Sequence, residues 1–160
     1  MILSATIPPS RHLPFGVPIS KERRCGVRTF SLTVVTPDGV AYQGDATAFL
    51  ARTCAGDVEI LAGHTDYLAA LATGRASIRT ADGVLRSAAL SGGVLSVKRG
   101  VVSVAATTFE YAEDIDKKRA ERAKENAESA IRRAADERSL RLAKAKLERA
   151  LLRIDVAGDR

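Results

Sequence analysis

Apolar and polar residues alternate along the middle of the chain, and this alternation predicts β-strands. In residues 30–35, Phe30, Leu32 and Val34 fall on one face of such a strand. The same period of two predicts further strands over residues 40–43, 46–52, 76–80, 84–88, 94–98 and 101–105. Turn residues separate them: Thr36-Pro37-Asp38-Gly39 suits a type I turn, Asp82-Gly83 a hairpin, and Ser91-Gly92-Gly93 a break between strands. The pattern predicts an antiparallel β-sandwich or barrel over residues 30–109.

After Phe109 the pattern becomes helical. Apolar residues three or four apart form two stripes, Ala120, Ala123, Ala127, Ala130/Ile131 and Ala134, and then Leu140, Ala143, Leu147, Ala150/Leu151 and Ile154. Asp114 or Asp116 suits the cap of the first helix, and the polar residues 136–139 separate the stripes. We therefore expect an α+β chain in two parts, whose residues 110–157 form an antiparallel two-helix hairpin and residues 158–160 a tail. Because alanine buries little apolar surface, the hairpin should dock weakly.

Residues 1–29 follow neither period and contain four of the five prolines. Proline interrupts regular pairing, so we expect a disordered leader. Five basic residues against one acidic residue leave an organelle transit peptide open. A third alternative is that translation starts at Val27 from a GTG codon, in which case the leader is not made.

The charge distribution argues against nucleic-acid binding. The net charge of +6 lies mostly in the leader, whereas residues 30–109 are neutral and residues 110–160 hold 14 basic and 12 acidic residues. Binding to phosphates needs clustered positive charge, which the helical region interleaves with acids, and its helices contain no aromatic residue for stacking. A stand-alone basic nucleic-acid-binding module is therefore the alternative function, not the favoured one.

The sequence offers little for catalysis or metal binding. Cys25 and Cys54 form no Cys-x-x-Cys motif, which excludes a cysteine-rich zinc site and a disulfide framework. His12 lies in the leader and His64 stands alone, so no nucleophile–base pair of a small hydrolase is evident. No apolar run approaches the ~20 residues that cross a bilayer. We expect no catalytic residue and no metal site.

Four segments match motifs of one protein family in order and register. They are Thr36-Pro37-Asp38-Gly39-Val40, Gly56-Asp57-Val58-Glu59-Ile60-Leu61-Ala62-Gly63-His64, Leu90-Ser91-Gly92-Gly93-Val94-Leu95-Ser96-Val97 and Ile115-Asp116-Lys117-Lys118-Arg119-Ala120. Together they resemble the epsilon subunit of the bacterial F-type, proton-translocating ATP synthase, over about four fifths of the chain. Glu59 and Ala62 depart from the family's Gly and Pro.

The resemblance implies a non-catalytic subunit of the rotor. In that family the β-sandwich binds the gamma subunit and sits on the ring of c subunits, which couples proton transport to ATP synthesis. The hairpin either folds onto the sandwich or extends along gamma toward the alpha and beta subunits, where it inhibits ATP hydrolysis. The implied location is peripheral, on the cytoplasmic side of the bacterial plasma membrane, with an organelle inner membrane left open.

The resemblance also implies two sets of contact residues. Asp57 and His64 match positions near the c ring and gamma. The alternatives are an ordinary loop aspartate and a histidine that satisfies its own loop. Basic residues of the second helix approach an acidic segment of the beta subunit in the family, and the candidates here are Arg141, Lys144 and Lys146. The alternative for these is a solvated helix face.

A third implied site binds regulatory ATP, since some bacterial members hold ATP in the folded hairpin and no cofactor is otherwise required. Asp116 and Arg119 match the nucleotide-contacting motif, and Arg149 and Arg153 match paired arginines of the second helix. Those two arginines share one helical face and suit phosphates. Glu110 would accept from the adenine amino group. The alternative is a local Asp116–Arg119 ion pair beside surface arginines.

Overall fold

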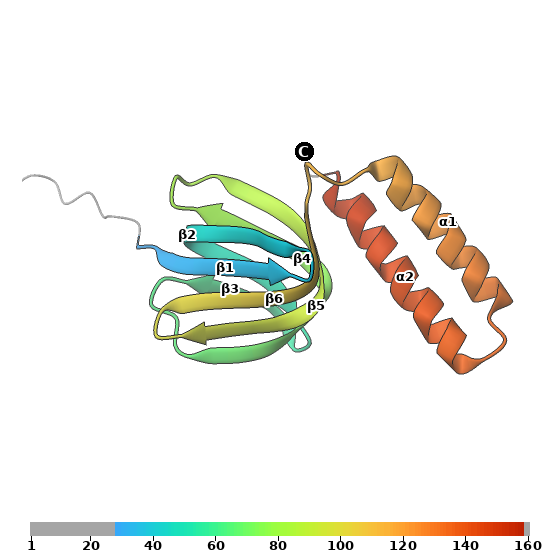
Figure 1. Ribbon diagram of the computed structural model, residues 1–160, viewed down its shortest axis with the longest axis horizontal. Helices are drawn as coiled ribbons and strands as arrows, with labels where there is room; N and C mark the ends of the chain where they lie inside the picture. The colour runs from blue at the N-terminus through green and yellow to red at the C-terminus, as the bar shows by residue number, and fades with distance from the viewer. Residues whose placement is uncertain (1–27, 159–160) are drawn as a thin grey trace, which may run out of the picture.

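The computed structural model describes residues 28–158, so the prediction of a disordered leader falls almost wholly outside them. Within these residues the chain forms six strands followed by two helices (Figure 1). The strands are β1 (Phe30–Thr36), β2 (Gly39–Thr53), β3 (Gly56–Leu61), β4 (Tyr67–Thr80), β5 (Leu85–Lys98) and β6 (Val101–Tyr111), and the helices are α1 (Lys117–Arg133) and α2 (Glu137–Val156). The predicted fold class, a β-sandwich or barrel followed by a helical hairpin, is confirmed.

The strands close on themselves. Their order is β1-β6-β5-β4-β2-β3, and β1 also pairs with β2, so five strands form a ring to which β3 adds at the far half of β2. The pairs are antiparallel except β1 with β6, which run parallel. Closure removes the exposed edges of these five strands and encloses a core between two curved layers.

Several strands are longer than the sequence pattern predicts. The predicted strands 40–43 and 46–52 are one strand, β2, because pairing with β1 continues through Gly44 and Asp45. The predicted break at Ser91-Gly92-Gly93 is wrong, since β5 runs through it while paired with β4 and β6. β3 and the first half of β4 were not predicted as strands.

Gly93 allows β5 to bend where it pairs closely with Ala106 of β6. Its backbone has φ +140°, and a Cβ atom at this position would lie 2.2 Å from the carbonyl oxygen of Ala105. Gly92, with φ +59°, precedes it. The glycine pair therefore marks a corner of the barrel rather than a turn between strands.

Apolar side chains, most of them aliphatic, fill the sandwich. Phe30, Leu32 and Val34 are buried, as their shared face predicts. The largest fully buried side chains are Phe49, Leu32, Ile60, Ile78, Leu90, Leu95, Val34, Val102, Val104 and Val156. Apart from Val156, all of them come from the strands, so the sandwich has a core that does not depend on the hairpin.

Both helices begin after an aspartate that caps their first turn. Asp116 caps α1 by accepting from the backbone N–H of Arg119, which confirms one of the two predicted caps. Asp136 caps α2 in a capping box with Ser139, and that hydrogen bond lowers the pKa of Asp136. Four residues after α1 ends at Arg133, α2 begins at Glu137, so the predicted hairpin is present.

The two helices meet through alanines spaced by seven. Ala120 and Ala127 of α1, with Ala143 and Ala150 of α2, are buried. Ala123, which the predicted stripe includes, is exposed, because it faces a cavity beside the helices. Small side chains give little apolar burial along the seam.

Candidate functional site

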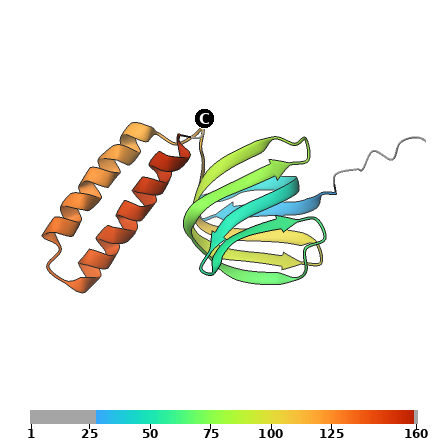
Figure 2. The same cartoon turned by 180° about the vertical axis from the view of Figure 1, so that it is seen from behind.

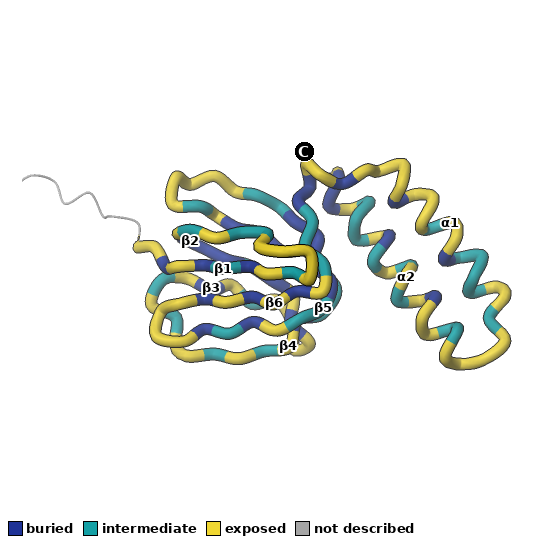
Figure 3. The backbone as a smooth tube through the Cα atoms, viewed as in Figure 1, coloured by how far each residue is buried: buried dark blue, intermediate teal, exposed yellow. Residues whose placement is uncertain are grey.

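The hairpin contacts the sandwich through one end of α2. In Figures 1 and 2 the two helices stand beside the sandwich, and most contacts of α2 with the sandwich are with β4 and β5. Figure 3 shows a mostly exposed or half-buried hairpin whose buried positions are few. The apolar contact is a small cluster separate from the main core, consisting of Ala89, Ala112, Ile115, Val156 and Ala157, with Leu152 packed against it.

Glu110 of β6 and Arg153 of α2 form a bidentate ion pair across this junction. Arg153 Nη2 lies 2.6 Å from Glu110 Oε1, and Nε lies 3.0 Å from Oε2. The side chains are 27% and 38% exposed, respectively, so the pair is partly shielded from water. The hydrogen bond with Glu110 raises the pKa of Arg153 although burial opposes the shift. Paired parallel hydrogen bonds of this kind are among the stronger polar contacts in proteins.

The predicted nucleotide residues gather around two adjoining cavities. The first, of about 390 Å³, is lined by Glu110, Asp116, Arg119 and Arg153, together with Asp114, Ile115, Ala120 and Ala123. The second, of about 330 Å³, contains Arg149 and shares Ala123 and Arg153 with the first. The structure therefore brings all five predicted residues to one region, from β6, the start of α1 and the end of α2.

Three of these five side chains, those of Asp116, Glu110 and Arg153, already have intramolecular roles. The carboxylate of Asp116 accepts from the backbone N–H of Arg119 at 3.2 Å, so their contact is a helix cap rather than the side-chain ion pair considered above. Glu110 holds the guanidinium of Arg153. A ligand phosphate would have to compete with that carboxylate for Arg153.

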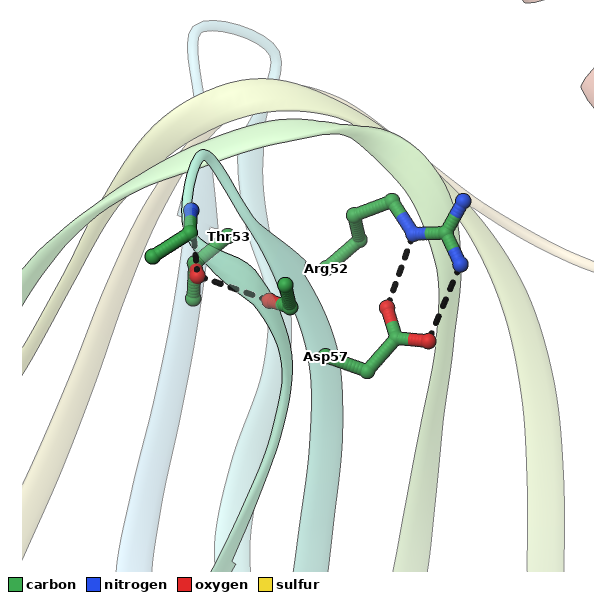
Figure 4. Close-up of polar contacts among 5 residues, drawn as sticks. Arg52, Thr53 and Asp57 are labelled. Atoms are coloured by element: carbon green, nitrogen blue, oxygen red, sulfur yellow. Dashed lines mark hydrogen bonds and ion pairs between the residues drawn. The ribbon is translucent and has the colours of Figure 1, made fainter.

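Asp57 lies in the β2–β3 hairpin and is held by Arg52. Figure 4 shows the pair: Arg52 Nε and Nη2 lie 2.8 and 2.9 Å from the two carboxylate oxygens of Asp57. The hydrogen bond with Arg52 lowers the pKa of Asp57. Thr53 closes the same turn by donating to the carbonyl oxygen of Gly56 at 2.7 Å. Asp57 therefore presents a paired carboxylate, not a lone charge.

Gly74 makes room for this arrangement. A Cβ atom at Gly74 would lie 2.5 Å from Cβ of Arg52. The stem of Arg52 consequently crosses β4 where β4 has no side chain.

His64 lies in the loop that follows β3. Its Nδ1 lies 2.8 Å from the carbonyl oxygen of Thr65, and its ring meets Tyr67 edge-on at 5.7 Å between centroids. These contacts agree with a histidine that satisfies its own loop, and the contact of His64 with another subunit stays a prediction.

The predicted beta-subunit residues lie toward the free end of α2. Arg141 pairs with Glu137 one turn earlier at 3.1 Å, and both side chains are highly exposed. Lys144 and Lys146 are exposed. Lys146 also lines the second cavity, and none of the three residues contributes to the junction with the sandwich.

Two further ion pairs at the junction were not predicted. Arg75 of β4 bonds Asp155 of α2 at 2.8 Å, 80 residues apart in sequence. Arg86 of β5 pairs with Glu113 just after β6, and its guanidinium carbon lies 3.7 Å above the ring of Tyr111. No local spacing signal links such distant residues, so only the fold reveals them.

Comparisons with known proteins match both parts of the chain. The β-sandwich domain of the ATP synthase delta/epsilon chain matches residues 29–112, and the long α-helix domain of the same chain matches residues 113–158. The chain belongs to the ATP synthase delta/epsilon-chain family. Bacterial epsilon chains are among its relatives. The ATP synthase epsilon chain of Bacillus velezensis is 39% identical over 83% of this chain and 100% of its own length. That of Bacillus subtilis is 38% identical over 82% and 99%, respectively. The resemblance predicted from the four motifs is confirmed.

Solved ATP synthases contain chains of similar fold. One, from the mitochondrial ATP synthase of Euglena gracilis in an OSCP/F1/c-ring structure, has a TM-score of 0.70 and 25% identity, over 82% of both chains. Another, from the central stalk and c ring of the Tetrahymena thermophila mitochondrial enzyme, has a TM-score of 0.58 over 80% of this chain and 96% of its own. At 18% identity, the second supports the fold alone.

Residues 28–158 contain neither a metal-binding cluster nor a membrane-spanning helix. In that part of the chain, His, Cys, Asp and Glu side chains form no group of three or more that could hold a metal ion. No helix described there is long and apolar enough to cross a membrane.

Proposed function

We propose that this family member is a non-catalytic central-stalk subunit that joins gamma to the c ring of an F-type ATP synthase and restrains ATP hydrolysis through its hairpin. The observation that carries the proposal is the unequal packing of the two parts. The sandwich is closed and has its own core, whereas the hairpin is attached at one end of α2 by a small apolar cluster and ion pairs. Such a chain can remain bound through the sandwich while the hairpin changes position.

The shape of the hairpin supports the regulatory part. A 20-residue helix such as α2 is about 30 Å long, enough to reach well beyond the sandwich once it is released. Arg141 and Lys144 lie toward its free end, where they would meet an acidic surface of the beta subunit first. Contacts between exposed charges of this kind orient a partner and weaken as salt rises.

The β2–β3 hairpin and the following loop support the contact with the c ring and gamma. Arg52 fixes the direction of the Asp57 carboxylate on β3, and His64 lies in the loop that follows β3, so the two residues belong to one continuous segment at the edge of the sheet. A fixed, exposed ion pair is suited to setting orientation in a contact with basic loops.

Isolation of the complex through this chain tests the assembly. Gamma and c subunits should be recovered together with it from detergent-solubilised membranes. Recovery of the chain without either subunit, or with nucleic acid in their place, would contradict the proposed role.

Regulatory ATP binding is a second candidate function, favoured by the convergence of Glu110, Asp116, Arg119, Arg149 and Arg153 on two adjoining cavities. The Glu110–Arg153 pair implies that phosphates bind in competition with Glu110. Glu110 would then turn from Arg153 to the adenine amino group.

Calorimetric titration of the Glu110→Ala variant separates these roles. Removing the competing carboxylate frees Arg153, so tripolyphosphate should bind about tenfold more tightly, which corresponds to one charge-assisted hydrogen bond. ATP should gain less than tripolyphosphate, because the variant also lacks the adenine contact. Glu137→Ala, which removes an equal charge at the far end of α2, is the matched control. Equal gains for both ligands would remove the adenine role, and no heat from either protein at millimolar ATP would remove ATP as a ligand.

A further inference from the structure

The apolar contact between the hairpin and the sandwich is small for a stable docking surface. It consists of three alanines, Ile115 and Val156, with Leu152 at its edge. Ala89 is its contribution from the strands, and the remaining members belong to the linker and the end of α2. Burial of so few methyl groups against the sandwich provides a limited driving force.

Ion pairs flank this cluster. Glu110 and Arg153 lie beside the first cavity, whereas Arg75 and Asp155 line a third cavity, of about 350 Å³, between α2 and the sandwich. Arg153 and Asp155 are two positions apart on α2. The partner of Arg153 is Glu110 on β6, and the partner of Asp155 is Arg75 on β4. Side chains two positions apart on a helix leave it on different sides, so the two pairs hold the end of α2 from both sides.

The linker is held separately. Ala112 N–H donates to the carbonyl oxygen of Ser87 at 2.9 Å, and Glu113 pairs with Arg86, which stacks on Tyr111. The chain is thus fixed to β5 as far as Glu113, and a departing hairpin would pivot after this residue. Docking then depends on what holds α2 itself.

We propose that the ion pairs Glu110–Arg153 and Arg75–Asp155 form a clasp that holds α2 against the sandwich, so that charge, more than apolar burial, sets the docked fraction of the hairpin. This inference rests on the proposed function in one respect only, which is that release of α2 from the sandwich would allow the hairpin to inhibit ATP hydrolysis. The docking equilibrium can be measured in the isolated chain. A result that overturns the clasp would therefore leave the proposed role in the central stalk unaffected.

Charge exchange tests the clasp in the full-length chain. Spin labels at Ala135, between the helices, and Asp82, in the β4–β5 turn, report docking as one defined distance distribution, which broadens when the hairpin leaves, once Cys25 and Cys54 are replaced by serine. Glu110→Arg or Arg153→Glu should lower the ratio of docked to undocked hairpin about tenfold or more, because like charges then face each other across the junction. The double variant, with both charges exchanged, should recover the docked distance.

The pair formed by Glu137 and Arg141 provides the matched control. It lies within α2 and away from the junction, so reversing either charge should leave the distance unchanged. Recovery in the Glu110→Arg/Arg153→Glu double variant also shows that a single variant lost docking rather than its fold. Failure of the double variant to recover docking, or an unchanged distance in both single variants, would overturn the clasp.

The salt dependence of docking provides an independent test in the chain that keeps both ion pairs. Raising NaCl from 0.1 M to 1 M shortens the screening length from about 10 Å to about 3 Å, so a charge-held hairpin should undock as salt rises. An apolar contact does not weaken in this way. A docked fraction that stays constant or increases over this range would contradict the clasp.

Discussion

Deleting residues 113–160 is expected to raise ATP hydrolysis by the assembled complex several-fold while the truncated subunit stays bound. β6 ends at Tyr111, and the main core lies entirely within the strands, so the sandwich keeps its packing without the helices. The deletion removes the arm that would otherwise extend toward the alpha and beta subunits. The measurement is the ATPase rate of purified complex, normalised to its content of this subunit.

A matched full-length variant guards against a general effect of altered charge. Exchanging Lys124 and Glu128, which pair with each other one turn apart on α1, keeps the helices and their net charge, and should leave the rate close to that of the unaltered complex. An unchanged rate in the deletion complex, with the subunit present, would argue against an inhibitory arm. Loss of the truncated subunit would instead show that the helices contribute to assembly.

Replacing Gly93 with alanine is expected to lower the free energy of unfolding of the sandwich by about 3 kcal/mol or more. The new methyl group would lie 2.2 Å from the carbonyl oxygen of Ala105 and 2.9 Å from Cα of Ala106, both backbone atoms of β6. The φ of +140° adds strain, because side chains are rarely found there. Urea unfolding followed by circular dichroism measures the change.

Gly39→Ala separates collision from strain. Gly39 has a nearly identical φ of +135°, but a Cβ atom there would meet nothing within 4 Å. Its replacement should cost only the backbone strain, about 1–2 kcal/mol. Equal losses in the two variants would mean that the bend at Gly93 does not require close contact between β5 and β6.

The sequence pattern predicts the fold where local chemistry decides it. β1 is an example, since Phe30, Leu32 and Val34 alternate with polar residues and all three are buried. The cap at Asp116 is another, because one side chain and one backbone N–H determine it. These features need no knowledge of distant parts of the chain.

The pattern fails where distant pairing decides the structure. A Gly-Gly pair ordinarily signals a turn, yet Gly92 and Gly93 continue a strand because β4 and β6 pair on either side. β3 has exposed ends, and Ile60 is its one fully buried side chain, so its alternation is weak. The first half of β4 is a nearly continuous run of Leu and Ala without a polar face.

The candidate site shows the same division. Glu110 and Arg153 could be named from the sequence as separate nucleotide contacts, but not as partners of each other, because 43 positions separate them. Asp57 could be named as an exposed acid, whereas its two hydrogen bonds from Arg52 depend on the β2–β3 hairpin and on the missing side chain at Gly74. Arg75 and Asp155 carry no sequence signal at all.

Locking the hairpin in its docked position tests the central claim most directly. In the complex, with Cys25 and Cys54 replaced by serine, cysteines at Arg75 and Asp155 are joined by a short, reducible thiol cross-linker. If the hairpin must leave the sandwich to inhibit, the locked complex hydrolyses ATP as fast as the deletion complex, and a reductant restores inhibition. Hydrolysis that stays inhibited while the cross-link is intact would contradict the account.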